Sequence, residues 1–166
     1  ASALNPDKML WTNQQHMLRS TPEHLATYLK PQLEALGLVA HDMAKVAAVA
    51  KAQQERAKTL KEMAANSVFF FSDVTVYDEK AAAKNLTAET APILAAVSAA
   101  LAALPEWRAP AIHQAVMAVA AEKGVGLGKV AQPIRVAVSG GTVSPPIDVT
   151  LEILGREATL ARLERA

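Results

Sequence analysis

The stretch LGKVAQPIRVAVSGGTVSPPIDVTLEILGREATLARLERA, residues 127–166, carries the clearest fold signal in the chain. Its aliphatic residues make two helical faces, Val130, Ile134 and Val138, then Ile147, Leu151 and Leu154. A Gly-Gly pair ends the first pattern, and a Ser-Pro-Pro run precedes the second. The stretch predicts helices over 127–139, 147–154 and 156–166. Pro133 predicts a kink or a restart in the first of them.

Helix signals continue upstream. The Ser-Thr-Pro-Glu run at 20–23 is typical of a capping box with proline in the first turn, and the leucines that follow reach a stop at Gly37. Similar patterns predict helices at 7–18, 42–65, 87–104 and 110–123, which places five helices in the second half. Hydrophobic residues make up 51% of the chain but aromatics only 4%, which favours helix over strand. The sequence therefore predicts an all-α fold.

The segment VFFFSDVTVYDEK, residues 68–80, interrupts the helical pattern because its three phenylalanines are contiguous. We interpret it as a buried aromatic anchor followed by a connection between subdomains, with a short strand as the weaker alternative. A boundary then falls between Ser72 and Asp78. The chain is predicted to contain two small helical subdomains, residues 1–72 and 73–166.

Bulk composition excludes several classes of protein. The formal net charge is only +1, so any nucleic-acid contact must be local rather than driven by overall charge. The apolar run at 91–104 is shorter than the roughly 20 residues of a membrane helix. Without cysteine there are no disulfides or thiolate metal sites, and a cytoplasmic protein is expected.

No set of residues indicates catalysis or metal binding. The four histidines are predicted to lie on different helices, and none is spaced as a ligand pair. In KGVGLGKV the phosphate-loop pattern fails, because Lys123 and Val130 occupy positions that need Gly and Ser or Thr. Ser139 and Ser144 lack a nucleophile elbow. The run SGGTVSPP stays open between a plain turn and a rigid edge that presents the Ser144 hydroxyl.

Three motifs together resemble the C-terminal anticodon-binding region of bacterial glutamyl-tRNA synthetases. GKVAQPIRVAVSGGTVSPPIDVTLEILGREATLARLE, residues 128–164, is similar to the end of that family. NPDKMLWTNQQHML, residues 5–18, resembles the helix after the catalytic lysine loop, with matches at Lys8, Leu10, Trp11, Asn13 and Gln14. ERAKTLKEM, residues 55–63, is followed by a Phe-rich segment and resembles the first anticodon-binding subdomain.

The resemblance implies five anticodon-binding residues: Arg56, Arg135, Ser144, Pro145 and Ile147. Arg56 corresponds to the family's helix arginine three residues before a Thr-Leu-Lys-Glu run. A guanidinium can address the acceptors of cytosine but not the donors of guanine, so Arg56 would prefer C over G at the third anticodon base. The family often has an aromatic where this chain has Asp148, which puts stacking at that position in doubt.

The family's His-containing nucleotide motif and its lysine loop do not occur in this chain, so we expect a fragment without a catalytic domain and without a cofactor of its own. The resemblance implies that the intact enzyme attaches glutamate to tRNA(Glu) with ATP and magnesium held in that domain. We expect a monomer whose partner is tRNA(Glu), not DNA or a membrane. The alternatives are a helical protein-interaction module, indifferent to RNA, and a small standalone enzyme, which lacks any clustered acid, base or nucleophile.

Overall fold

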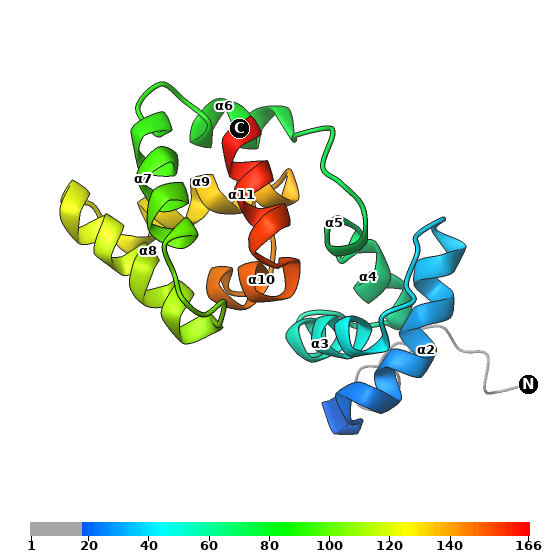
Figure 1. Ribbon diagram of the computed structural model, residues 1–166. Helices are drawn as coiled ribbons and strands as arrows, with labels where there is room; N and C mark the ends of the chain where they lie inside the picture. The colour runs from blue at the N-terminus through cyan, green and yellow to red at the C-terminus, as the bar shows by residue number, and fades with distance from the viewer. Residues whose placement is uncertain (1–17) are drawn as a thin grey trace, which may run out of the picture. The chain divides into compact units, whose positions relative to one another are not determined.

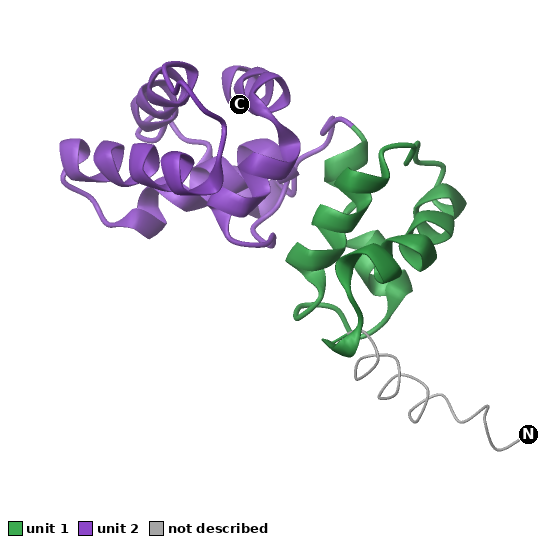
Figure 2. Ribbon diagram, turned by 60° about the horizontal axis from the view of Figure 1, so that its bottom comes forward, with its two compact units in different colours: residues 1–72 green, residues 73–166 purple. Residues whose placement is uncertain are grey.

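The computed structural model describes residues 18–166 (Figure 1). The predicted helix at 7–18, with the motif residues Lys8 to Gln14, lies outside the described residues except for Leu18. Within residues 18–166 the regular structure is entirely helical, which confirms the all-α prediction. The chain forms two compact units, residues 1–72 and 73–166 (Figure 2). Assigning both units to anticodon binding stays a prediction.

Unit 1 consists, in its described part, of α2 (Pro22–Ala35), α3 (Met43–Gln53), α4 (Leu60–Ala65) and α5 (Val68–Phe71). Helix α2 packs against both α3 and α4. The core is built from side chains that each expose 2% or less: Leu25, Leu29, Leu33, Val46, Val49, Met63 and Phe70. The predicted spacing of the leucines on α2 thus corresponds to its buried face.

Both ends of α2 have a physical cause in the sequence. Thr21 is the N-cap, and its Oγ1 accepts the His24 backbone N–H at 3.1 Å. The cap therefore lies one residue later than the predicted capping box, which required Ser20. At the other end, the Gly37 N–H donates to the Glu34 carbonyl while the Leu38 N–H donates to the Leu33 carbonyl. Gly37 has φ +80°, which is the left-handed conformation that ends a helix in this pattern.

The predicted continuous helix over 42–65 is wrong, because non-helical residues 54–59 separate α3 from α4. Thr59 caps α4 by accepting the Glu62 N–H at 3.0 Å, and the Glu62 carboxylate accepts the Lys58 N–H at 3.3 Å. The Thr-Leu-Lys-Glu run is therefore a helix start. The alanine-rich composition on both sides concealed that signal.

The aromatic segment forms the one-turn helix α5, in which Phe69 and Phe70 are buried with ring centroids 4.1 Å apart. This is the predicted anchor. Residues 73–78 that follow have no regular structure, so the strand alternative is wrong for the described chain. The segment leads directly into α6 (Glu79–Asn85), where the Asp78 carboxylate accepts the Ala81 N–H.

Unit 2 contains α6 followed by α7 (Ala91–Ala102), α8 (Ala109–Lys123), α9 (Leu127–Ser139), α10 (Ile147–Leu154) and α11 (Arg156–Arg165). The predicted bounds of α9 and α10 are confirmed. The prediction of five helices missed α6, although an aspartate cap before Glu-Lys-Ala-Ala-Ala was visible in the sequence. Six helices therefore make up this unit, and α7 starts at Ala91 rather than at residue 87.

Helix α9 is the central element of unit 2, since it packs against each of the other five helices. More than half of its residues are buried, and Gln132, Arg135 and Ser139 form one partly exposed face. The buried residues are Val130, Ala131, Pro133, Ile134, Val136, Ala137 and Val138. The helix runs unbroken through Pro133, so the predicted restart does not occur. A proline removes one backbone hydrogen bond, and the packing of α9 against its five neighbouring helices offsets that cost. Residues near its end are consequently held in fixed positions.

Candidate nucleic-acid interface

Arg135 lies near the end of α9 and is partly exposed, although its helix is the central one. Its Nε donates to the Ser144 Oγ at 2.7 Å, and its Nη1 donates to the Gln132 Oε1 at 2.6 Å. The Ser144 hydroxyl and the Gln132 amide are both neutral groups. Because Nε and Nη1 are bonded to different residues, the plane of the guanidinium is fixed at the protein surface.

Ser144 links the loop 140–146 to α9 and α10. Its Oγ accepts from Arg135 and donates to the Pro145 carbonyl at 2.7 Å. Thr150, fully buried on α10, also donates to the Pro145 carbonyl at 3.0 Å. Ser144 itself exposes only 6% of its surface. Of the two alternatives left open for this loop, a rigid edge that presents the Ser144 hydroxyl does not agree with the structure, because the hydroxyl is bonded within the protein.

Pro145 and Ile147 are also buried, and Ile147 exposes 6% of its surface at the start of α10. Their side chains serve the core of unit 2, and this burial leaves little surface for stacking on a base. Asp148, which stands at the position where stacking was in doubt, is partly exposed. The accessible parts of this loop are instead Thr142, Val143 and Pro146, with Val143 71% exposed.

Arg56 lies in the turn between α3 and α4 and not on a helix, which corrects the expectation taken from the resemblance. The turn is anchored on either side of it, by Gln53 and by Ala57. Gln53 is 2% exposed and donates to the Ser67 Oγ at 3.2 Å, and Ala57 is 1% exposed. The Arg56 side chain is exposed, and no hydrogen bond or ion pair to another residue of 18–166 engages its guanidinium. Its backbone is fixed while its side chain can reorient.

The turn around Arg56 carries further exposed cations. Lys58 and Lys61 flank the start of α4, and Lys51 lies in the last turn of α3. Glu55 and Glu62 lie among them, so the local charge is positive without being extreme. Such a surface can attract a phosphate backbone locally even though the chain as a whole carries only +1.

Sequence reasoning brought Arg135 and Ser144 to one site, and the structure places them in direct contact. It missed the two residues that complete this site, Gln132 and Thr150. Gln132 precedes Arg135 by three residues, so both lie on one face of a helix, and this spacing could have identified it. Thr150 had no local signal, because its partner Pro145 belongs to a loop. Arg56 lies in the other unit.

Within residues 18–166 no cluster of His, Asp or Glu is arranged to hold a metal ion. The same part of the chain contains no helix with the length and apolarity needed to cross a bilayer.

Comparison with known proteins bears on the whole chain. Glutamate–tRNA ligase 1 of Alkalilimnicola ehrlichii is 53% identical over 166 residues, and glutamate–tRNA ligase 2 of Halorhodospira halophila is 51% identical over the same length. Each match covers all of this chain, which spans 35% of the length of these relatives. The crystal structure of a glutamate tRNA ligase from Elizabethkingia meningosepticum, in complex with its amino acid, matches 96% of this chain and 31% of its own. That match has a TM-score of 0.87 at 28% identity.

A family model described as the anticodon binding domain matches residues 24–166. This range includes both Arg56 and the site around Arg135. The resemblance to glutamyl-tRNA synthetases found in the sequence motifs is therefore confirmed, and the chain belongs to the anticodon-binding domain family of glutamate–tRNA ligases.

Proposed function

We propose that this chain reads the anticodon of tRNA(Glu). The observation that carries the proposal is the fixed guanidinium of Arg135, bonded to Ser144 and Gln132 at the partly exposed end of α9. Sequence-specific RNA recognition works mainly on splayed single-stranded bases whose edges are hydrogen-bonded by side chains. An arginine held in one plane suits such an edge, because little conformational entropy is lost when the base binds.

In this proposal the residues of the site around Arg135 have unequal roles. Arg135 contacts a base, and Ser144, which is buried, holds Arg135 in place. Pro145 and Ile147 shape the loop from inside. The exposed stretch around Val143 supplies apolar surface and backbone groups beside the guanidinium. Pro145 and Ile147 remain proposed anticodon-binding residues through the loop they shape, although their side chains offer the RNA little surface.

Arg56 is proposed to read the third anticodon base. Cytosine presents acceptors at O2 and N3, so a guanidinium can donate hydrogen bonds to it. Guanine presents donors at N1 and N2, which would face the donors of the guanidinium without a hydrogen bond. Glutamate and glutamine anticodons differ by C against G at that base. The exposed position of Arg56 in an anchored turn is compatible with a side chain that orders when the base arrives.

The activity of the longer enzyme is part of the same proposal. Relatives of about three times this length are named glutamate–tRNA ligases, so we place this chain in a protein that joins glutamate to tRNA(Glu) with ATP and magnesium. Those ligands would be held by a catalytic domain outside these 166 residues, and this chain alone would be inactive. A cytoplasmic monomer is the proposed form.

The test is a titration of the 166-residue chain with tRNA(Glu). We expect saturable binding to tRNA(Glu) and to its isolated anticodon stem-loop. Binding should be weaker to an otherwise identical stem-loop whose anticodon bases are exchanged. The salt dependence should be moderate, since few phosphate contacts are expected. Equal affinity for both stem-loops would refute anticodon reading, and no binding to either would favour a protein-interaction module.

A further inference from the structure

Residues 73–78, called the strap from here on, lie against the turn that ends α9. The Asp78 N–H donates to the Gly140 carbonyl at 2.8 Å. Gly140 has φ +83°, and a Cβ at this residue would lie 2.9 Å from the Val76 carbonyl oxygen and 3.2 Å from the Val74 Cγ1. The strap and the turn are therefore so close that only a glycine fits between them.

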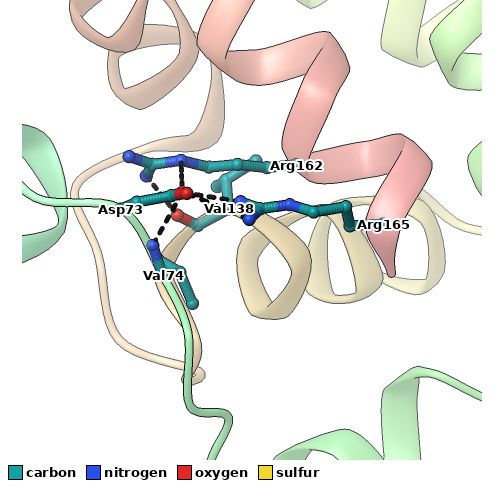
Figure 3. Close-up of polar contacts among 5 residues, drawn as sticks. All are labelled: Asp73, Val74, Val138, Arg162 and Arg165. Atoms are coloured by element: carbon teal, nitrogen blue, oxygen red, sulfur yellow. Dashed lines mark hydrogen bonds and ion pairs between the residues drawn. The ribbon is translucent and has the colours of Figure 1, made fainter.

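The first residue of the strap is held by the last helix (Figure 3). Arg165 binds the Asp73 carboxylate with both terminal nitrogens, Nη2 to Oδ1 at 2.6 Å and Nη1 to Oδ2 at 2.9 Å. Arg162 approaches the same carboxylate, with its Nε 3.6 Å from Oδ1, and its Nη1 donates to the Val138 carbonyl at 2.7 Å. One guanidinium thus joins the strap to the end of α9.

The buried charge of Arg162 requires a nearby counter-charge, which Asp73 supplies. Arg162 exposes only 6% of its surface, and burial lowers the pKa of its guanidinium while the Asp73 carboxylate opposes that shift. A buried cation that loses a counter-charge is strongly destabilising. Asp73 therefore has a larger structural effect than an isolated surface carboxylate, even though its own side chain is 58% exposed.

The turn that receives the strap also supports the proposed base-reading site. Val138 and Gly140 flank Ser139, whose Oγ donates to the Arg135 carbonyl at 2.6 Å. Gly140 then begins the connection that leads to Ser144, the partner of Arg135. The strap is bonded to this turn at two points, through Arg162 to Val138 and through Asp78 to Gly140.

From this arrangement we infer that the strap is a positioning element for RNA recognition: it must be seated against Gly140 for Arg135 and Ser144 to hold their binding geometry. The inference rests on the proposed function and adds a residue set that touches no RNA itself. It places the control of the site in the segment that joins the two units along the chain. Seating of the strap and binding of the anticodon then favour each other reciprocally.

The first test compares Gly140→Ala with Gly124→Ala in the 166-residue chain. Both glycines end a helix with positive φ, +83° and +66°, so both substitutions strain the backbone. A Cβ at Gly124 would meet no atom within 4 Å, whereas one at Gly140 collides with the strap. Gly140→Ala is expected to weaken binding of the tRNA(Glu) stem-loop about tenfold, because it displaces the strap in addition to straining the backbone. Gly124→Ala should bind within about twofold of the wild type, because it shares the backbone strain but leaves the strap in place. Equal affinities of the two variants would overturn the inference.

The second test covers the case in which Gly140→Ala fails to fold. Asp73→Asn is compared with Glu164→Gln, because each removes one negative charge and Glu164 is exposed on α11 next to Arg165. A lost negative charge alone should strengthen RNA binding equally in both. Asp73→Asn is expected to bind the cognate stem-loop more than about threefold more weakly than Glu164→Gln, because an exposed ion pair alone accounts for about that factor and Arg162 here also loses its counter-charge. Affinity for the exchanged-anticodon stem-loop should match in both variants, which a loss of folded protein would not produce.

Amide hydrogen exchange decides the inference independently of RNA. In the wild type the amides of Asp78, Gly140 and Gly141 should be protected, because they donate to the Gly140 carbonyl, the Val136 carbonyl and the Ser139 Oγ. Both variants, Gly140→Ala and Asp73→Asn, should lose protection at residues 78, 140 and 141 while α7 and α8 keep theirs. Unchanged protection of these three amides in both variants would contradict the inference. If the wild type binds no RNA, the proposed function fails, and the exchange result still decides whether the strap positions this turn.

Discussion

Arg135 and Arg56 are the same residue type with the same predicted task, but the protein surrounds them differently. Arg135 stands on a central helix and is bonded by two neutral side chains, one of them almost completely buried. Arg56 stands in a turn, exposed, with its backbone anchored and its side chain unengaged by residues 18–166. In the proposed recognition, the Arg135 guanidinium is positioned before RNA binds, and the Arg56 guanidinium is ordered only when RNA binds.

This difference separates affinity from discrimination. A preorganised group loses little entropy on binding and contributes most of its interaction energy to affinity. A mobile arginine gives up part of its energy to ordering, but a wrong base opposite it still leaves donors facing donors. Arg135 is thus expected to dominate how tightly the anticodon is held, and Arg56 to influence which anticodon is preferred.

The largest expected effect is that of Arg135→Ala on tRNA(Glu) binding. Affinity should fall by about 1–3 kcal/mol, the scale of a good bidentate base contact. The fold should persist, because the Arg135 side chain is partly exposed and the core residues of α9 are unchanged. The measurement is a stem-loop titration normalised to the folded fraction from the helical circular dichroism signal.

Arg135→Lys sharpens this prediction. Lysine keeps the charge but cannot present a planar fork to Ser144, Gln132 and a base together. Its affinity should therefore stay close to that of Arg135→Ala. Recovery of the full wild-type affinity by lysine would mean that Arg135 acts as a simple phosphate contact and that the fixed geometry is irrelevant.

The next effect, on discrimination, is expected from Arg56→Gln. Glutamine both donates and accepts, so guanine becomes tolerated at the third base, and the preference for tRNA(Glu) over tRNA(Gln) should shrink by about 1 kcal/mol, the lower end of a base contact. Charging of both tRNAs by the full-length enzyme measures the ratio. Most of the change should come from better relative use of tRNA(Gln).

Lys58→Gln is the matched control for Arg56→Gln. Lys58 is an exposed cation in the same turn, two residues further along, and its substitution removes the same charge. It should weaken both tRNAs alike through a lost phosphate contact. An identical response of the two variants would assign Arg56 to the phosphate backbone and remove the contrast between affinity and discrimination.

The helices that the sequence predicted accurately are those with a strong local signal at both ends. Helix α9 runs from Leu127 to Ser139 as its apolar spacing and the Gly-Gly pair indicated, and α10 follows the prolines. The errors fall where composition is uniform. Alanine-rich sequence concealed the Thr59 cap between α3 and α4, and the short alanine-rich helix α6 was not predicted. Caps outweighed composition in both cases.

The candidate site was predictable in part, for a different physical reason. The pair of Arg135 and Ser144 could be proposed from family motifs, but burial is a tertiary property that no motif contains. Ser144 therefore changed from an exposed hydroxyl to an internal link. The strap could not be foreseen, because Asp73 and Arg165 are 92 residues apart in sequence and meet only in the folded unit.

A smaller effect is expected from Ser144→Ala. The Arg135 Nε and the Pro145 carbonyl would each lose a partner, although Thr150 still donates to that carbonyl. The free energy of unfolding should fall by about 0.5–1.5 kcal/mol, the net value of a typical hydrogen bond. Urea denaturation measures it, and RNA affinity should fall less than in Arg135→Ala. A larger loss of affinity than for Arg135→Ala would place the base contact at Ser144.

The smallest effect concerns the pH dependence of the strap. The hydrogen bonds from Arg165 lower the pKa of Asp73 below its ordinary value of 3.8. A carboxyl with a depressed pKa in the folded state stabilises that state above its unfolded value, and the contribution disappears as the pH falls through the folded value. The stability difference between wild type and Asp73→Asn should therefore be constant from about pH 5 to 8 and shrink only below pH 3.8. Urea denaturation of both proteins across this range measures the difference.

Because the carboxylate is solvent-accessible, added salt should reduce the difference at neutral pH, whereas a buried contact such as that of Ser144 should not respond. A stability difference that shrank between pH 6 and 8 would show that another titrating group causes it, and that the Asp73 carboxylate does not hold the strap in place.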